Sequence, residues 1–328
     1  MWAGIIGVSF GLVIAFGAWR VRSSVVRSDT PVATATPRVG VEKNRITIDK
    51  PRDFDVITAS SYTVSGITKS SSWVVVSVGN TDYFTQSATD GSFSVEIEPD
   101  AGINKIKATS INDQGDSSSQ EVLAVYSSSF QSEPTEDSKS SDVDSEVLQK
   151  IAEAENPPKA YIGTVTDIAD STIQIKSVDS QIQQIATDKF DVAVVNAKDS
   201  ASKVIKLTDI AIGDYIIAMG YVDGNDVLDV KRILVSSAVA DTKITVSMQK
   251  VESVDKKFLT VTSPSDGEET TFTPDKNTEI ISVSEKGLKN IKMSDISASD
   301  TVITVLDTTG TPAISRAVFA IENKGKDN

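Results

Sequence analysis

Carboxylates are the most abundant side chains in this sequence that could do chemistry, and their usual catalytic partners are missing. The 328 residues include 46 Asp and Glu but no His and no Cys. This composition excludes Ser-His-Asp and Cys-His catalysis, the common zinc sites, haem ligation by His, and disulfides. Two carboxylates could still hydrolyse a glycosidic bond. Because nearly all Asp and Glu fall in predicted turns or in a linker, we expect no catalytic residue and no enzyme.

Acidic residues at predicted turns could instead bind calcium, which prefers hard oxygen ligands. The sequence contains no EF-hand loop and no Gly-Asp repeat. Aspartate is common at turns without a metal, because its carboxylate accepts hydrogen bonds from nearby backbone N–H groups. We therefore expect no metal site and no cofactor. The turn residues considered are Asp90, Asp113, Asp116, Asp223 and Asp226.

Three aromatic residues, Trp73, Tyr83 and Tyr126, are the candidate ligand contacts, since aromatic side chains line most binding sites and could stack on a glycan. Trp73 begins a predicted strand, and a single Trp packed between two sheets is usual in β-sandwiches, so we favour a core position for it. Nucleic acid is excluded as a partner, because the net charge is −14 and phosphate binding needs a basic face.

The N-terminal residues predict a membrane segment. Met1–Trp19 contain no charged side chain. Nineteen helical residues reach about 28 Å, which is close to the hydrocarbon thickness of a bilayer. A cleaved signal peptide is the alternative, but the run lacks a basic leader and a small-x-small site directly after it. We expect residues 1–22 to be an uncleaved single-pass anchor that contacts membrane lipid through Met1–Trp19.

Two features of the sequence predict opposite orientations for this anchor. Arg20, Arg22 and Arg27 follow it, and the positive-inside rule by itself would place the rest of the chain in the cytoplasm. The rest is rich in Ser and Thr, acidic and free of Cys, as exported domains are, and long domains translocate largely regardless of charge. We expect a cell-membrane protein whose bulk is extracytoplasmic.

Residues 23–43 have no helical or strand period and predict an extended tether. Residues 44–127 predict a β-sandwich, because short runs of β-forming residues recur between turn residues. The runs are Arg45–Ile48, Tyr62–Ile67, Trp73–Val78, Phe93–Ile97, Ile103–Ala108 and Val122–Tyr126.

Four phrases in this region occur in a characteristic order. They are Thr63–Gly66, Asp90–Ser94, Gly102–Ile106 and Asp113–Asp116. In this order they resemble the bacterial Ig-like domains of cell-surface proteins and of some multidomain glycosidases. The resemblance covers about 85 residues. It implies a β-sandwich, and such domains are mostly spacers or binding modules.

Residues 128–158 predict an acidic, Ser-rich linker. Eight acidic residues stand against two lysines, so this stretch cannot bury enough apolar surface to order itself. One exception is Ser145–Glu155, where a Ser cap and three apolar residues on one face predict a short helix.

Residues 159–238 and 241–323 predict two copies of one fold, followed by a tail at 324–328. Ile205–Asp214 recurs as Ile291–Asp300, at an offset of 86 residues, and flanking segments match at nearly the same offset. Short strands, a single helical turn and a closing hairpin in each copy predict a small OB-like barrel of five or six strands.

The first copy also resembles a bacterial domain family of unknown function found in exported proteins. The resemblance rests on Gly163–Ile168 and Gly213–Gly220. The second copy has Ser299-Asp300 in place of Gly213-Asp214, and it lacks the later glycine, so it departs from the pattern.

The expected fold class is therefore mainly β: an N-terminal transmembrane helix, an Ig-like β-sandwich and two tandem OB-like β-barrels. The expected function is structural or adhesive, with an envelope protein or a glycan as partner. The alternative functions are a glycan-binding accessory module of a surface enzyme system and a carboxylate-based hydrolase. The residues singled out are positional: Met1–Trp19 and the turn glycines Gly91, Gly102 and Gly213.

Overall fold

A computed structural model describes residues 45–128, 156–198, 202–284 and 287–321. The chain divides into two compact units, Met1–Lys43 and Asn44–Asn328, and all described residues belong to the second unit. Its regular structure consists of β-strands and two single-turn 3-10 helices, η2 (Leu207–Asp209) and η3 (Met293–Asp295).

The expected fold class requires a correction at the N-terminus. The predicted anchor Met1–Trp19 lies outside the described residues, as do the tether at 23–43, the predicted helix Ser145–Glu155 and the tail at 324–328. In the part that the structure describes, no helix is both long enough and apolar enough to cross a membrane. Apart from η2 and η3, the described elements are strands that satisfy their backbone hydrogen bonds on neighbouring strands. The described residues are mainly β, and the expected transmembrane helix has no support among them.

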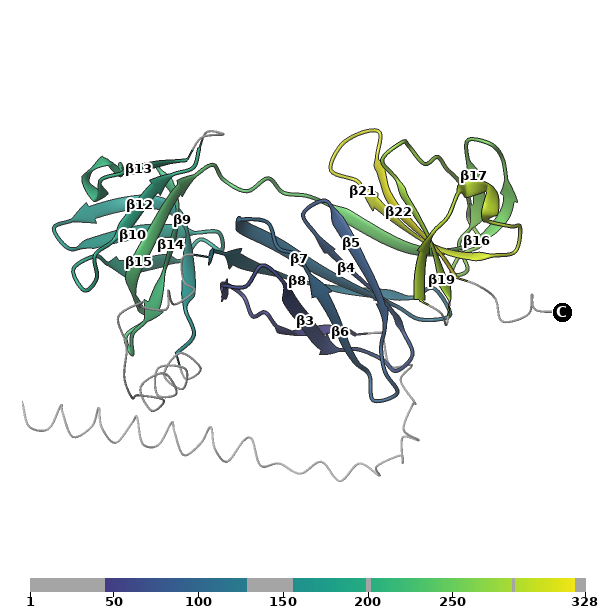
Figure 1. The fold of residues 1–328 in the computed structure, drawn as a ribbon, viewed down its shortest axis with the longest axis horizontal. Coiled ribbons are helices and arrows are strands. Elements are labelled where there is room, and N and C mark those ends of the chain that lie inside the picture. Colours follow the sequence, from purple (N-terminus) through teal and green to yellow (C-terminus); the bar gives the residue numbers. More distant parts are fainter. Residues whose placement is uncertain (1–44, 129–155, 199–201, 285–286, 322–328) are drawn as a thin grey trace, which may run out of the picture. The chain divides into compact units, whose positions relative to one another are not determined.

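The first module, which we call the sandwich, consists of two sheets that share one core (Figure 1). Its strands are β1 (Thr47–Lys50), β2 (Val56–Ile57), β3 (Tyr62–Ile67), β4 (Trp73–Val78), β5 (Thr81–Gln86), β6 (Ser92–Ile97), β7 (Gly102–Ile111) and β8 (Ser117–Tyr126). One sheet has the order β1-β3-β6 and the other β2-β8-β7-β4-β5. Successive side chains of a strand point to opposite faces, so alternate residues such as Val64, Val76 and Ile106 meet in the core.

The predicted strands Tyr62–Ile67 and Trp73–Val78 are confirmed with the same bounds, whereas β2 and β5 were not predicted. Gly91, Gly102 and Gly213 all have a positive φ, of 85°, 92° and 93°. Their turns therefore use the left-handed region that glycine enters without steric cost.

The second module, repeat 1, is a seven-stranded sheet that closes on itself. Its strands are β9 (Lys159–Ala169), β10 (Thr172–Ser177), β11 (Ile182–Ala186), β12 (Ala193–Asn196), β13 (Lys203–Ile205), β14 (Tyr215–Val222) and β15 (Val227–Ser236). The order is β11-β10-β9-β14-β15-β12-β13, and a further parallel pairing of β11 with β15 closes a five-stranded ring. The ring surrounds a core that includes Val165, Ile175 and Ile233.

The third module, repeat 2, has the same strand order at the same sequence offset. Its strands are β16 (Ile244–Val254), β17 (Leu259–Thr262), β18 (Glu269–Phe272), β19 (Glu279–Ser284), β20 (Gly287–Asn290), β21 (Thr301–Asp307) and β22 (Ile314–Ile321). The order is β18-β17-β16-β21-β22-β19-β20. Within the described residues β18 does not pair with β22, so this ring stays open.

Local geometry also repeats between the two copies. Before η2, the Lys206 amide donates to the Asp209 carboxylate at 2.9 Å, and before η3 the Lys292 amide donates to Asp295 at 3.0 Å. Each copy has a bulge at the equivalent step, after Met219 in β14 and after Val305 in β21. The resemblances to the Ig-like and OB-like families stay predictions.

Candidate functional site

The outer face of the sandwich sheet β5-β4-β7 binds repeat 2 through a buried hydrophobic cluster. Val75 and Ile111 of the sandwich pack in this cluster with Ile303 and Val305 of β21. The rings of Phe84 and Phe319 stack across the junction, with centroids 4.7 Å apart. We call this contact docking site 2. It buries a face of repeat 2 that would otherwise expose a large apolar patch.

Repeat 1 joins the sandwich at a second place, which we call docking site 1. The amide of Val56 donates to the Pro158 carbonyl at 3.1 Å, and the amide of Ala160 donates to the Phe54 carbonyl at 2.8 Å. A smaller hydrophobic cluster lies beside these bonds and contains Val125 of the sandwich with residues of β9 and β14. The start of β9 is thus fastened to the sandwich by backbone hydrogen bonds as well as by packing.

Both repeats use the same face for docking. At the offset of 86 residues, members of one docking cluster correspond to members of the other. The corresponding pairs are Ala160 and Val246, Ile162 and Met248, Ile217 and Ile303, and Met219 and Val305. The sandwich is therefore a central module that binds the equivalent face of two repeats at two different places.

A buried ion pair reinforces docking site 2. The Arg316 Nε atom of β22 donates to the Asp82 carboxylate of β5 at 2.9 Å, and Arg316 Nη1 donates to the Gly79 carbonyl at 2.9 Å. The side chains are only 11% and 2% exposed. Burial raises the pKa of Asp82, and the neighbouring Ser77 hydroxyl and Arg316 guanidinium act in the opposite direction. Ser77 and Arg316 thus partly offset the effect of burial on this carboxyl group.

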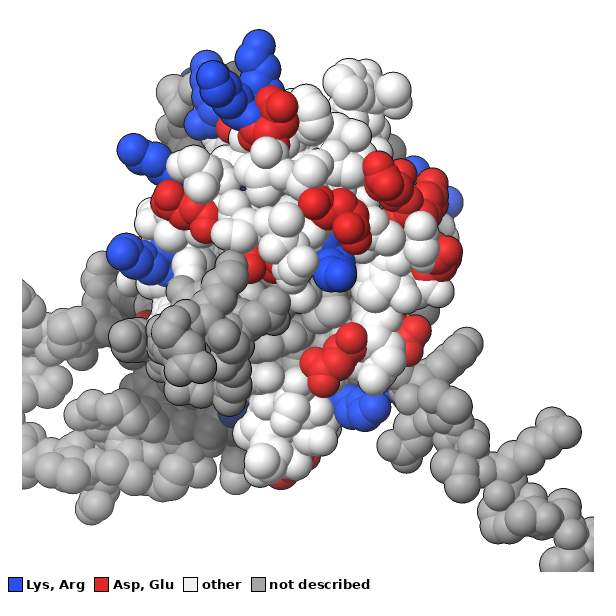
Figure 2. All heavy atoms as spheres, turned by 90° about the vertical axis from the view of Figure 1, so that its right-hand side faces the viewer, with Lys and Arg blue, Asp and Glu red and all other residues white. Residues whose placement is uncertain are grey.

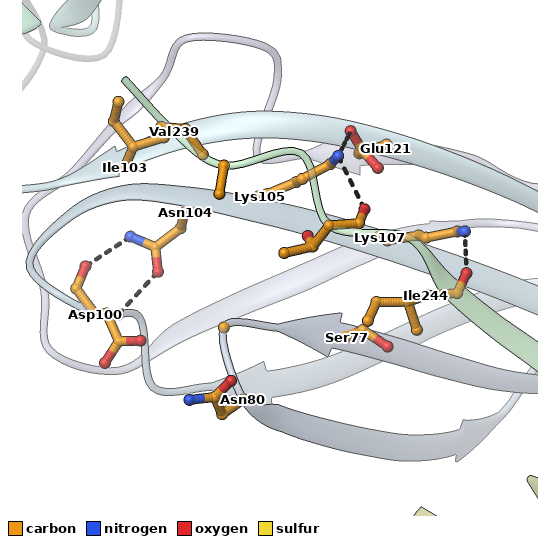
Figure 3. Close-up of a pocket in the computed structure, with 13 residues that line it drawn as sticks. Ser77, Asn80, Asp100, Ile103, Asn104, Lys105, Lys107, Glu121, Val239 and Ile244 are labelled. Carbon is orange, nitrogen blue, oxygen red and sulfur yellow. Dashed lines mark hydrogen bonds and ion pairs between the residues drawn. The ribbon is translucent and has the colours of Figure 1, made fainter. Parts of the chain in front are cut away.

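A groove of about 190 Å³ runs between β7 and the segment 237–243 that connects the repeats, which we call the connector groove (Figure 3). The Lys105 Nζ atom lies 3.1 Å from Glu121 and 3.0 Å from Asp241, and it also donates to the Thr242 carbonyl. Lys107 donates to the Ile244 carbonyl at 2.5 Å. The two lysines thus fasten the connector to the sandwich.

The electrostatics of the connector groove keep its lysine charged. Partial burial acts to lower the pKa of Lys105, but hydrogen bonds to Asp241 and Glu121 outweigh it, so the pKa lies above its ordinary value. The pKa of Asp241 is lowered, mainly by its hydrogen bond to Lys105. The two ion pairs of Lys105 therefore join Asp241 of the connector to the sandwich.

The three aromatic residues proposed from the sequence do not form one platform. Trp73 packs on the docking cluster and lies 5.5 Å from the Phe84 ring, so its expected position between the sandwich sheets is wrong. Tyr83 packs on the opposite, internal face, and its hydroxyl accepts a hydrogen bond from the Glu98 amide at 3.0 Å. Tyr126 packs on the sandwich core and lines a separate pocket.

Two of the turn aspartates, Asp90 and Asp223, serve as local hydrogen-bond acceptors. The Asp90 carboxylate accepts from the Ser92 amide at 2.9 Å, and Asp223 accepts from the amides of Asn225 and Val227 at 2.8 and 3.0 Å. The Ser92 hydroxyl, which donates to Asp90 at 2.7 Å, lowers the pKa of Asp90 together with the Ser92 amide, and the amides of Val227 and Asn225 lower the pKa of Asp223. Over the described ranges, no group of three or more His, Cys, Asp or Glu residues could hold a metal ion.

Docking site 2 was not predicted from the sequence, although one signal for it was present. Trp73–Val76 is an unbroken apolar run, and strands buried on both faces have such runs instead of alternation. Asp82 and Arg316 gave no comparable signal, because they are 234 residues apart and resemble surface charges. On the face seen in Figure 2, acidic and basic side chains are interspersed among neutral ones, so charge alone does not single out a site there.

Comparisons with known proteins do not assign the chain to a family. No protein-family model matches it, and no curated protein matches it. Among solved structures, one described as "Structural insight into host cell surface retention of a 1.5-MDa bacterial ice-binding adhesin" aligns with 85% of this chain and 97% of its own. The identity is 14% and the TM-score is 0.19, which is too low to support an argument about this chain.

Proposed function

We propose that this protein is a structural or adhesive component of a cell surface, in which the sandwich holds two β-repeats in a fixed arrangement for presentation to partners. The observation that supports this proposal is the double docking. Modules that only extend a protein away from the cell surface need flexible linkers between them. Here, in contrast, each repeat buries a hydrophobic face against the sandwich. Fixed modules of this kind present surfaces to an envelope protein or a glycan.

An adhesion measurement tests the proposal. The full chain is immobilised on beads, and bead retention under flow is measured on surfaces coated with glycans or with envelope proteins. We expect retention by the native chain. Arg316→Met, which removes one partner of the buried ion pair, should reduce it. Lys189→Met is the matched control, because Lys189 is half-exposed and pairs with Asp229 within repeat 1.

Two outcomes would contradict the proposal. One is that native beads are retained on none of these surfaces. The other is that the chain turns over polysaccharide substrates in a hydrolase screen, which would favour the carboxylate chemistry considered from the sequence.

A further inference from the structure

A pocket of about 450 Å³ lies where the end of the sandwich meets repeat 1, and we call it the Tyr126 pocket. Its wall contains Tyr126 and Ser127 of the sandwich and Ile217, Arg232 and Leu234 of repeat 1. Small-molecule sites commonly enclose about 300–1,000 Å³ and combine apolar walls with a few placed polar groups. This pocket has the size and the mixed lining of such a site.

Arg232 is the distinctive residue of the Tyr126 pocket. Its Nε atom is buried and has no hydrogen-bond partner among the described residues, and no described carboxylate forms an ion pair with its guanidinium. An unpaired polar group in such a place is destabilising, because it has lost its water without gaining a partner. Arg232 is only half-buried and lines the pocket, so an anion that enters there meets a guanidinium that no described carboxylate pairs with.

Comparison with repeat 2 shows that the docking face does not require this arginine. Arg232 faces Met219 across the β14–β15 pair, and Ala317 faces Val305 across the equivalent β21–β22 pair. Ala317 is 1% exposed and packs in the cluster of docking site 2. At the same position of the same face, one repeat thus has a methyl group in a packed junction and the other has a cation beside a pocket.

The other residues of the pocket wall indicate which chemical groups the ligand has besides its negative charge. The Tyr126 ring, Ile217 and Leu234 offer an apolar surface, and Ser127 and Ser236 offer hydroxyl groups. A sugar ring has an apolar face and a rim of hydroxyls, and a uronic acid adds a carboxylate that matches the planar fork of a guanidinium. We propose that the Tyr126 pocket binds an acidic monosaccharide unit, with Arg232 donating to its carboxylate. This site goes beyond the structural role proposed above and does not depend on it.

Calorimetric titration of the full chain tests this site, with galacturonate as the probe and galactose as its neutral counterpart. We expect galacturonate to bind more tightly by about tenfold or more, because charge-assisted hydrogen bonds are about twice as strong as neutral ones. Arg232→Met should abolish this preference, and Arg232→Lys should restore part of it. Lys231→Met is the matched control, since Lys231 is adjacent but lies 4.9 Å from the Phe190 and Tyr221 ring centroids.

The proposal fails if native protein binds neither sugar, or binds galacturonate and galactose equally well. It also fails if inorganic phosphate binds as tightly as galacturonate, because the pocket would then recognise charge alone. If Arg232→Met and Lys231→Met lose the same affinity for galacturonate, Arg232 has no specific role in binding it. The comparison of the two sugars on native protein stands even if a variant does not fold, and thermal unfolding of each variant identifies that case.

Discussion

Repeat 1 and repeat 2 have the same strand order but are stabilised in different ways. In repeat 1 the parallel pairing of β11 with β15 closes the ring, and its docking cluster is small. Repeat 2 lacks that pairing within the described residues, and its docking cluster is larger, with stacked phenylalanines and a buried ion pair. A duplicated fold can thus exchange internal closure for stabilisation by a neighbour. Repeat 2 should depend on the sandwich more than repeat 1 does.

The largest expected effect compares equivalent residues of the two docking faces. Phe319 and Leu234 occupy the same position, since they pair with Ile303 and Ile217 respectively. Phe319→Ala should lower the free energy of unfolding by about 3–5 kcal/mol, because a fully buried aromatic is lost. Leu234→Ala should cost only about 1–2 kcal/mol, because Leu234 is half-buried. Urea denaturation followed by circular dichroism measures both, and equal losses would refute the asymmetry.

The ion pair of docking site 2 should also contribute more to the free energy of unfolding than the ion pair of docking site 1. Arg316→Met leaves the Asp82 carboxylate buried and unpaired, which should cost about 3–5 kcal/mol. Lys159→Met removes the pair with Asp55, whose side chains are 28% and 22% exposed, and should cost less than about 1 kcal/mol. The same urea titrations compare the two variants. A loss in Arg316→Met no larger than in Lys159→Met would contradict the central role of docking site 2.

The cost of Arg316→Met should also depend on pH. Burial raises the pKa of Asp82, and loss of Arg316, which lowers it, raises it further. A carboxyl group whose pKa is raised on folding contributes stability below its unfolded pKa of 3.8 and loses that contribution as pH rises through the folded pKa. The difference in unfolding free energy between native protein and Arg316→Met should therefore shrink as pH falls from neutral toward that value. A difference that grows toward acid would mean that Asp82 does not titrate in this way.

The smallest expected effect concerns the equivalent turns before β14 and β21. Gly213 has φ 93° and Ser299 has φ 74°, so the serine occupies a left-handed conformation. That conformation costs an L-residue about 1–2 kcal/mol. A glycine avoids this cost, but it loses more conformational entropy on folding, which offsets part of the gain in stability. Ser299→Gly should stabilise the protein by about 0.5–1 kcal/mol and Gly213→Ser should destabilise it by about 1 kcal/mol. A calorimetric melting temperature that falls in Ser299→Gly would contradict this explanation.

The fold was predictable from the sequence wherever one strand face is polar. Phe93–Ile97 alternates, so its inward residues could be assigned, and the positive φ of Gly102 was expected. The two-residue strand β2 is too short to show a pattern, and β5 follows β4 after a tight turn that was not predicted from the sequence. Short strands and continuous apolar runs are the places where periodicity is least informative.

The docking sites were not predictable, because they depend on contacts between distant segments. Trp73 was assigned to the space between the sheets, since a single strand does not show which of two buried faces lies against a neighbouring module. Arg232 and Ala317 occupy equivalent positions but differ in chemistry, and only the strand pairing shows that they correspond. The Tyr126 pocket follows from that correspondence, which spacing alone does not provide.

The central claim, that the sandwich binds repeat 2 at docking site 2, can be tested by cross-linking, because the chain has no native cysteine. A Cβ built on Gly115 lies 3.8 Å from the Pro264 Cβ, a separation that suits a disulfide. We predict that Gly115→Cys with Pro264→Cys forms an intramolecular disulfide under mild oxidation, even though a cysteine is strained at the φ of +84° of Gly115. Gly115→Cys with Val178→Cys, at the equivalent position of repeat 1, should not. Equal cross-linking of the two pairs, or none in the first, would contradict the account.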